Sequence, residues 1–320
     1  SFETLRGGLE SPAVTRVGAR FFDPGGRPRS LHFVVKRLEG GPAREADLYE
    51  SRVAESARGM SPELLGVERT GDDRCLLFLE AIRTPLRWPW RDPAQAGLVL
   101  ERLAAFHASP AVIPPVAAWD YESDLLAAAG RTLSALEELP RAPETRTARR
   151  ALPALRRVVR NLPALRRWLM ELPGLEATVI HGDAHPGNVL LRSRRGLPEP
   201  VLLDWGRARV GSPLEDVSSW LQSLGYWEPQ ARRRHDTLLL RYLAARGLPG
   251  FLDRRRRDAY WIAGASNVLA GALSYHLWRF READSKAEAG RPLHAALDAL
   301  RIIRRAVQPL IRGSSPLAAV

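Results

Sequence analysis

An eight-residue polar stretch, His181–Asn188 (HGDAHPGN), stands between the apolar runs Val179-Ile180 and Val189–Leu191. Polar residues bracketed in this way are typical of a loop that is held rigidly at both ends. Within the stretch, Asp183 can accept a proton from a hydroxyl nucleophile. Asn188 offers a neutral oxygen, which hard cations accept as a ligand. The pattern therefore indicates a catalytic loop that works on a hydroxyl group beside a metal ion.

A second carboxylate follows the next apolar strand. This strand ends at Leu203, Asp204 comes directly after it, and Gly206 lets the backbone turn. An Asp at the end of such a strand can bind a metal ion directly. Together with Asp183 and Asn188 it makes up one proton acceptor and two oxygen ligands, which is the set that phosphoryl transfer through Mg²⁺ requires.

Lys36 is a further candidate. It ends the run Leu31–Val35, and the chain has only one other lysine, Lys286, among its 48 basic residues. A compact ammonium group on a strand suits a triphosphate as a point charge. Such a cation needs a carboxylate to hold it. Glu45, at the start of the next expected helix, is the first candidate, and Glu50 is the alternative.

Taken together, these motifs resemble those of the aminoglycoside phosphotransferase family, a group of small-molecule kinases similar to choline, homoserine and fructosamine kinases. The resemblance spans most of the chain. It implies an α+β, protein-kinase-like bilobal fold with a small β-rich N-lobe and a large, mainly α-helical C-lobe. The matching stretches, in family order, are Phe33–Lys36, Arg44–Tyr49, His181–Asn188, Asp204–Gly206 and Leu214–Val217.

The resemblance also implies roles for the residues already singled out. Asp183 would be the catalytic base, and Asn188 and Asp204 would bind Mg²⁺. Lys36 would contact the α- and β-phosphates of ATP or GTP, with Glu45 behind it. The expected reaction is transfer of the γ-phosphate to a hydroxyl group of a small molecule, either an antibiotic or a metabolite.

Supporting and nucleotide-binding positions follow from the same resemblance. His181 and Asp216 would brace the catalytic loop. The backbone at the end of an expected strand would hold the adenine, and a loop near the N-terminus would cover the phosphates, although it carries only a single Gly-Gly pair. The residues expected to contact the nucleotide in these two places are Leu79, Glu80, Ala81, Gly7, Gly8 and Ser11.

The order of strand-like and helix-like segments fits two lobes. A turn signal separates the strand-like runs Ala13–Phe22 and Leu31–Leu38, residues 43–57 have helical character, and Arg74–Ala81 predicts a further strand. From about residue 92 onward the pattern becomes helical, with helices expected near residues 95–108, 121–139, 145–172, 229–246, 258–282 and 292–311. We expect a nucleotide-binding lobe at residues 1–81, a helical lobe with the catalytic loop and acceptor pocket at 82–312, and a tail at 313–320.

Composition narrows the setting of the protein. A single cysteine, Cys75, excludes an internal disulfide, and no apolar leader opens the chain, so we expect a reducing cytoplasm. The uncharged segment Trp261–Trp278 contains too many polar and small residues for a membrane span and predicts a buried helix.

The net charge is +12, but the arginine doublets and the run Arg254–Arg257 lack interleaved aromatic residues. They predict a solvated surface, and nucleic acid is not an expected partner.

Two other functions are compatible with parts of the sequence. A metal-dependent hydrolase would use His181, Asp183 and His185 as ligands, with Asp204 as a fourth. A non-catalytic kinase-like binding module would keep the fold without the reaction.

The sequence does not determine which acceptor is phosphorylated: a cationic antibiotic would require an acidic pocket wall, and an anionic metabolite would suit the arginines. Candidate acidic walls are Asp120, Glu122, Asp124 and Glu215.

Overall fold

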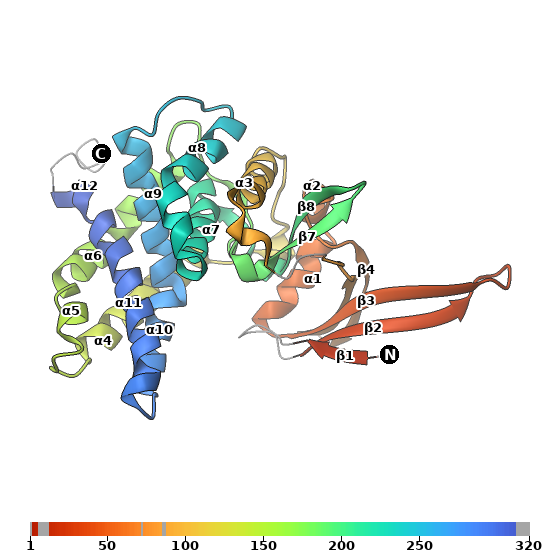
Figure 1. Ribbon diagram of the computed structural model, residues 1–320, viewed down its shortest axis with the longest axis horizontal. Helices are drawn as coiled ribbons and strands as arrows, with labels where there is room; N and C mark the ends of the chain where they lie inside the picture. Colours follow the sequence, from red (N-terminus) through yellow and green to blue (C-terminus); the bar gives the residue numbers. More distant parts are fainter. Residues whose placement is uncertain (1, 6–12, 72, 85–87, 312–320) are drawn as a thin grey trace. The chain divides into compact units, whose positions relative to one another are not determined.

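The computed structural model describes residues 2–5, 13–71, 73–84 and 88–311. The chain forms two compact units, one made of Ser1–Ala118 with His181–Arg209 and the other of Trp119–Ile180 with Val210–Val320. The N-terminal part is rich in strands and the C-terminal part is helical, which confirms the predicted α+β class (Figure 1). The catalytic-loop segment belongs to the first unit, so the units are not the predicted lobes. The expected border at residue 81 stays a prediction.

The first unit is built on an antiparallel five-stranded sheet with the strand order β1-β2-β3-β5-β4 (Figure 1). Strand β2 has the predicted bounds, and β3 and β5 extend or shorten the predicted runs by a few residues. Strand β4 was not predicted. The strands are β1 (Phe2–Leu5), β2 (Ala13–Phe22), β3 (Pro28–Glu39), β4 (Leu64–Gly71) and β5 (Arg74–Glu80).

The hairpin between β2 and β3 turns at the predicted place. Asp23 Oδ1 accepts hydrogen bonds from the backbone amides of Gly25 and Arg27, both at 3.0 Å. Gly26 has a φ of 74°, a conformation that glycine adopts without a steric cost. The turn sets the register that places Lys36 opposite Val14 of β2, and on the other edge of β3 Lys36 lies opposite Leu77 of β5.

One helix predicted over residues 43–57 is two short helices, α1 (Arg44–Tyr49) and α2 (Arg52–Ser56). Ser51 separates them, because its hydroxyl donates to Leu48 O at 2.7 Å and accepts from the Val53 amide at 3.2 Å. Serine competes for backbone groups in this way and favours helix starts over helix interiors. The break leaves α1 as a separate element that carries Glu45.

The first unit also contains the strand pair β7 and β8, which follows the catalytic loop, and helix α3. Strands β7 (Val189–Arg194) and β8 (Leu197–Leu202) form an antiparallel pair in which Val189 lies opposite Leu202. Helix α3 (Pro93–His107) begins at Asp92, whose side chain caps the Ala94 amide. Cys75 is buried in the sheet, as a core residue rather than a reactive thiol.

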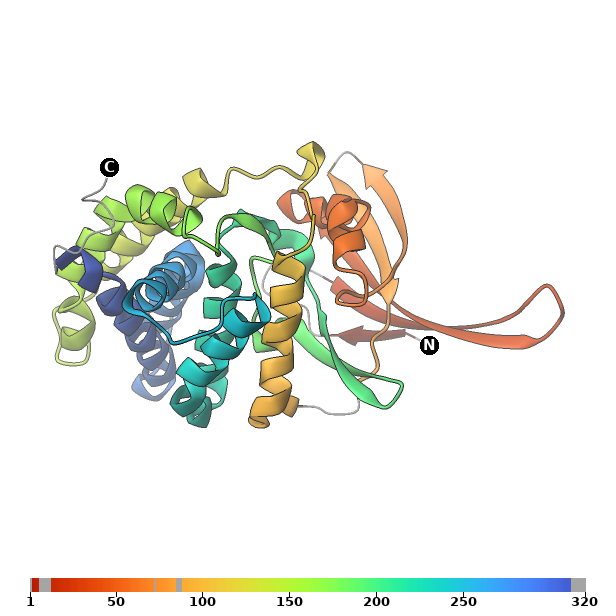
Figure 2. The same cartoon turned by 90° about the horizontal axis from the view of Figure 1, so that it is seen from above.

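The second unit is an assembly of helices (Figure 2). Strand β6 (Thr178–Ile180) pairs with β9 (Arg209–Gly211) at its edge. Four predicted helices are each divided: residues 145–172, 229–246 and 292–311 into two elements, and 258–282 by a π-helical turn at Val268–Ala272. The helices are α4 (Tyr121–Glu137), α5 (Arg146–Arg149), α6 (Leu152–Met170), α7 (Pro213–Trp227), α8 (His235–Ala245), α9 (Arg254–Asn267), α10 (Leu273–Arg281), α11 (Lys286–Ala306) and α12 (Gln308–Ile311).

Helix α6 shows how the arginine-rich sequence forms a core. Its apolar residues recur at helical spacing and are buried, from Leu155 through Leu162 to Leu169, while Arg156 and Arg160 point to solvent. One face of the helix therefore packs and the other is solvated. The part of the chain that the structure describes contains no helix that is long and apolar enough to cross a membrane.

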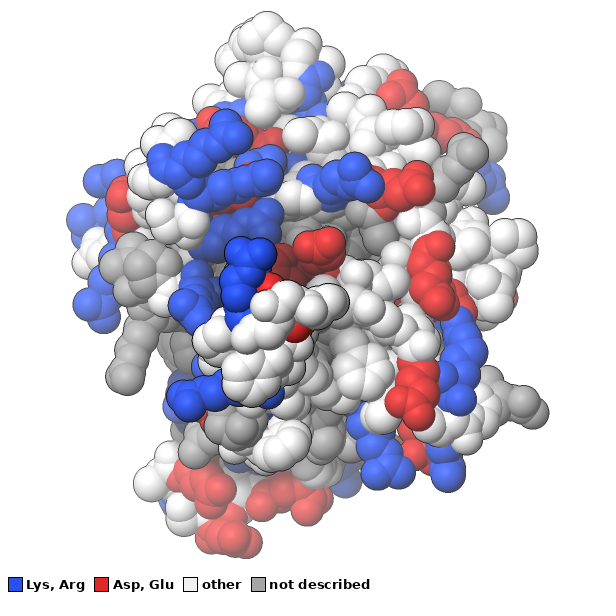
Figure 3. Space-filling model, turned by 90° about the vertical axis from the view of Figure 1, so that its right-hand side faces the viewer, with Lys and Arg blue, Asp and Glu red and all other residues white. Residues whose placement is uncertain are grey.

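Some basic side chains at the surface are paired with nearby acidic ones. Figure 3 shows Asp and Glu side chains beside Lys and Arg on one face of the molecule. In the run Arg254–Arg257, Arg256 lies 3.5 Å from Asp253 and Arg257 lies 3.2 Å from Asp236. These local ion pairs fit the expected solvated surface, and each contributes little to stability.

The packing of His235 in the second unit generates a pH prediction. Tyr260 Oη accepts from Gln222 Nε2 at 2.7 Å and lies 2.6 Å from His235 Nε2, so its single proton is donated to a neutral imidazole. Burial lowers the pKa of His235 from 6.5 to about 4. The folded protein therefore binds a proton more weakly than the unfolded chain. The stabilisation is complete above pH 6.5 and is lost as the pH falls toward 4.

We expect urea denaturation to show a loss of about 1–3 kcal/mol in the free energy of unfolding between pH 7 and pH 4.5 from this histidine. His235→Gln, which keeps an acceptor but cannot titrate, should reduce the pH dependence by that amount. An equally steep pH dependence in the variant would show that His235 does not titrate in this range.

Candidate active site

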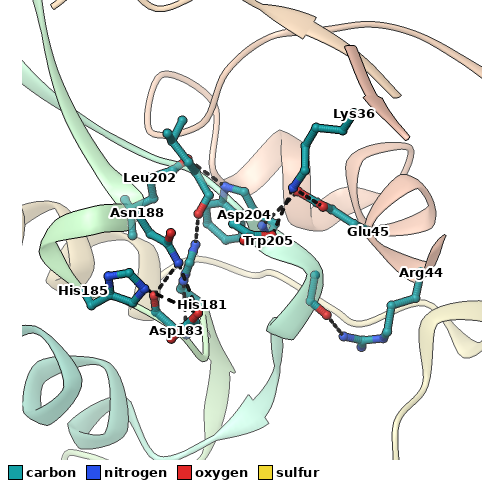
Figure 4. A network of polar contacts seen from close by, with 12 residues as sticks. Lys36, Arg44, Glu45, His181, Asp183, His185, Asn188, Leu202, Asp204 and Trp205 are labelled. Atoms are coloured by element: carbon teal, nitrogen blue, oxygen red, sulfur yellow. Dashed lines mark hydrogen bonds and ion pairs between the residues drawn. The ribbon is translucent and has the colours of Figure 1, made fainter. Parts of the chain in front are cut away.

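Lys36 lies between two carboxylates of the first unit. Its Nζ donates to Glu45 Oε2 at 2.6 Å and to Asp204 Oδ1 at 3.0 Å (Figure 4). Lys36 comes from β3, Glu45 from α1 and Asp204 from the turn after β8. The structure thus brings Lys36 to its first predicted partner. Glu50, the alternative, instead accepts from Arg69 at 2.7 Å.

The three charges define the electrostatics of the site. The side chains of Lys36 and Glu45 are only 8% and 2% exposed, whereas that of Asp204 is 40% exposed. Burial lowers the pKa of Lys36, but Glu45 and Asp204 more than offset this effect and raise it above its usual value. The lysine is therefore a buried, fixed cation at neutral pH, paired with the buried Glu45 and with the partly exposed Asp204.

Asp204 has an unusual backbone. Its φ of 63° and ψ of 66° lie in the left-handed region, which costs a non-glycine residue about 1–3 kcal/mol. Surrounding contacts hold this conformation: the next amide, that of Trp205, donates to Glu45 Oε1 at 3.2 Å, and Trp205 Nε1 donates to Leu202 O at 3.1 Å. Glu45 therefore orients both the lysine and the turn that carries Asp204.

The proposed base sits beside Asn188 in the catalytic loop. Asn188 Nδ2 donates to the Asp183 carbonyl at 3.1 Å and to Asp183 Oδ2 at 3.2 Å (Figure 4). His185 Nε2 lies 3.7 Å from the same carboxylate oxygen. The Asp183 side chain is 36% exposed, so it is oriented by the loop and still reachable by a substrate.

His181 is fully buried, and hydrogen bonds of its ring hold the catalytic loop in place. Its Nε2 lies 2.9 Å from Leu203 O, and its Nδ1 accepts from the Asp183 amide at 3.3 Å. These contacts place the ring proton on Nε2. The ring also packs edge-on against Trp205, with centroids 4.7 Å apart. Because both ring nitrogens are engaged, His181 does not fit the ligand role that the hydrolase alternative requires.

Gly182 permits the close approach of the loop to the turn after Asp204. It has a φ of 82°, and a Cβ atom at this position would lie 2.2 Å from Arg207 O. Arg209 Nη1 donates to Gly182 O at 3.3 Å and to Arg207 O at 3.2 Å. The two segments that carry Asp183 and Asp204 are therefore tied together at the backbone.

The donor set suits Mg²⁺. The Leu203 amide donates to Asn188 O at 2.7 Å, which holds Asn188 across from the residue before Asp204. With its amide nitrogen bound to Asp183, Asn188 has its Oδ1 left to bind a cation. No cluster of three His, Cys, Asp or Glu side chains forms a metal site among the described residues. One carboxylate and one amide oxygen match the way Mg²⁺ is held jointly by a protein and by substrate phosphates.

The remaining predicted residues lie elsewhere or have other contacts. Asp216 is buried in the first turn of α7 in the second unit, and its bracing role stays a prediction. Leu79 pairs with Val34 in the sheet, and the Glu80 amide donates to Glu63 O at 2.9 Å. Adenine binding at Leu79–Ala81 also stays a prediction. Gly7, Gly8 and Ser11 lie outside the described residues.

Two contributors were missed in the sequence. Trp205 links Glu45, His181 and Leu202 through its amide and its ring. Arg44 donates to backbone carbonyls on both sides of the site. The only signal for either residue was its place directly beside a predicted site residue.

Residues 19–260 match the family model described as the phosphotransferase enzyme family. No curated protein matches the chain by sequence.

Similar solved structures cover most of the chain at identities that show the fold alone, and they confirm the predicted protein-kinase-like fold. A choline/ethanolamine kinase family protein from Mesorhizobium loti is 19% identical over 95% of this chain and 92% of its own, with a TM-score of 0.58. Choline kinase LicA from Streptococcus pneumoniae is 14% identical over 94% and 93%, with a TM-score of 0.59. A mutant aminoglycoside phosphotransferase APH(4)-Ia, in a ternary complex with ADP and hygromycin B, is 16% identical over 94% and 94%, with a TM-score of 0.53.

The buried position of Lys36 predicts that Lys36→Arg is not a conservative change. The larger, planar guanidinium does not fit between Glu45 and Asp204, so we expect a loss of about 1–3 kcal/mol in stability from overpacking. Nucleotide binding, measured by titration with a fluorescent ATP analogue, should weaken strongly. Lys286→Arg, at the exposed start of α11, changes the only other lysine and should leave both quantities unchanged. Wild-type binding by Lys36→Arg would remove Lys36 from the nucleotide site.

Proposed function

Because the chain belongs to the phosphotransferase enzyme family, we propose that it moves the γ-phosphate of ATP or GTP to a hydroxyl group of a small molecule. The family membership makes the protein a kinase that acts on small molecules. The observation that carries the finer proposal is the arrangement of Lys36, Asp204, Asn188 and Asp183, which come from separate segments of one compact unit. One similar structure holds ADP and another holds GDP, which supports a purine nucleotide as the co-substrate.

The residues divide the work of the reaction. Asp183 Oδ2, oriented by Asn188, takes the proton of the acceptor hydroxyl while the hydroxyl oxygen attacks the γ-phosphorus, and the nucleoside diphosphate leaves. Lys36 neutralises charge on the phosphates. Mg²⁺, held by Asn188 and Asp204, would supply further positive charge at the β- and γ-phosphate oxygens. The contribution of the chain is therefore positioning and electrostatics.

The segment after Asp204 supports a small acceptor without prior activation. Helix α7 begins at Pro213, so little chain is left for a long regulatory segment. Ser212, the only hydroxyl residue between Asp204 and Asp216, is fully buried and accepts from the Leu214 amide at 3.3 Å. A buried capping serine is not accessible to a modifying enzyme. We infer that the protein is active as synthesised.

The acidic residues considered as walls for a cationic acceptor have other partners. In the second unit, Arg166 binds both Glu215 and Glu122, and its side chain is 3% exposed. Trp119 Nε1 donates to Asp124 Oδ2 at 2.5 Å, and Asp120 caps α4 at the Ser123 amide. Glu215 is buried against Arg166, so a polycation could bind it only by breaking this pair, and the other three carboxylates already accept hydrogen bonds from Arg166, Trp119 and the Ser123 amide. We therefore favour a neutral or anionic acceptor.

The role of Asp183 predicts the effect of Asp183→Asn. The amide cannot take a proton, so turnover should fall by a factor of about 10² to 10⁴, the usual contribution of a positioned base. Binding of Mg²⁺ with the nucleotide should change little. Asp124→Asn makes the same chemical change at a carboxylate of the second unit and should keep most of the activity. Normal turnover of Asp183→Asn would rule out Asp183 as the base.

The acceptor class is tested with a panel of small alcohols of three charge types, using transfer of labelled γ-phosphate as the signal. Neutral or anionic compounds, such as sugars and hydroxy acids, should be phosphorylated in preference to polycationic aminoglycosides and to choline. Preferential phosphorylation of an aminoglycoside would contradict the acceptor class but uphold the kinase reaction. No transfer to any acceptor, together with no Mg²⁺-dependent nucleotide binding, would contradict the proposed function itself.

A further inference from the structure

Arg44, in the first turn of α1, makes an unusual set of contacts with backbone carbonyls. Its Nη1 donates to Gly206 O at 2.6 Å, and its Nη2 donates to Ala208 O at 2.9 Å. Figure 4 shows Arg44 near the Lys36–Glu45 pair with one of these contacts. Its Nε and Nη2 also donate to Ala117 O, at 3.2 and 2.5 Å. One planar guanidinium thus joins α1 to the turn after Asp204 and to the 3₁₀ turn Pro115–Ala117.

Arg44 and its neighbour Glu45 hold the same turn by complementary groups. Glu45 accepts from the Trp205 amide, while Arg44 donates to the carbonyls of Gly206 and Ala208. Two consecutive side chains of one helix therefore bind the turn: Glu45 binds a backbone donor, and Arg44 binds two backbone acceptors. The geometry ties the position of the turn to the position of α1, and hence to the Lys36–Glu45 pair.

This connection bears on Asp204, because that residue needs outside support. Its left-handed backbone is unfavourable by itself, and the turn that follows it has no regular strand pairing before Arg209. The Asp204 carboxylate must also be held in a narrow range of positions if it is to share a small octahedral cation with Asn188. Contacts behind a ligand commonly set its affinity for the metal.

We propose that Arg44 is a positioning residue for the metal site: it fixes the 204–208 turn so that Asp204 presents its carboxylate to Mg²⁺. This inference rests on the proposed function. It assigns to Arg44 no contact with the substrate. A lysine at this position keeps the charge but presents a single nitrogen, which cannot reach three carbonyls in the fixed fork of a guanidinium.

The test compares Arg44→Lys with Arg69→Lys. Arg69 also binds the α1 region, with Nη2 2.7 Å from both Asp47 Oδ1 and Glu50 Oε2, but it is exposed and contacts no part of the 204–208 turn. Two quantities are measured in each protein: hydrogen exchange of the Trp205–Ala208 amides, and the Mg²⁺ concentration required for nucleotide binding. In Arg44→Lys the amides should exchange faster, and the Mg²⁺ requirement should rise about 10- to 100-fold. In Arg69→Lys neither should change.

The two readouts separate the outcomes. Unchanged exchange in Arg44→Lys overturns the inference whatever happens to activity. Faster exchange with an unchanged Mg²⁺ requirement means that Arg44 is structural only, which also overturns it. If Arg44→Lys does not fold, Arg44→Ala refolded with added guanidinium should recover Mg²⁺-dependent binding, and failure to recover would count against the inference. Failure of the proposed function is distinguishable, because it would show as absent Mg²⁺-dependent nucleotide binding in the wild-type protein.

Discussion

The contact of Lys36 with Glu45 and Asp204 is the interaction on which the rest of the site depends. It joins the middle of the sheet, a short helix and the turn after β8 through one buried ammonium group. A buried cation without partners would be strongly unfavourable, so the three elements are held in register by the need to keep this charge paired. The same charge lies beside the Asp204 carboxylate, which is 40% exposed, and in the proposed function it neutralises the phosphates.

A second, uncharged framework places the catalytic loop against this cation. Strands β7 and β8 align Asn188 with Leu203, whose amide donates to Asn188 O. The His181 ring is hydrogen-bonded to Leu203 O and packs edge-on against the Trp205 ring. The proposed base, the proposed metal ligands and the lysine therefore belong to a continuous set of backbone and side-chain contacts within one unit. Such preorganisation matters because phosphoryl transfer requires little covalent chemistry from the protein.

Much of this could be predicted from the sequence, for physical reasons that differ between elements. Strand β2 was predicted with its observed bounds because apolar alternation and a strong turn signal coincide there. The split of the helix at Ser51 depends on one hydroxyl whose two hydrogen bonds composition does not reveal. The choice between Glu45 and Glu50 was open until the fold showed Arg69 beside Glu50. The role of Arg44 had no signal beyond its place next to Glu45, since backbone carbonyls are its partners and every residue supplies one.

The central claim is that Asn188 and Asp204 hold the metal beside the phosphates that Lys36 contacts. It is tested most directly by a crystal structure of the complex with a non-hydrolysable ATP analogue and Mn²⁺, in which anomalous scattering locates the ion. The predicted result is an ion bound to Asn188 Oδ1 and the Asp204 carboxylate at about 2.1 Å, bridged to the β- and γ-phosphates. An ion bound instead by His185 and Asp183, or phosphates out of reach of Lys36, would contradict it.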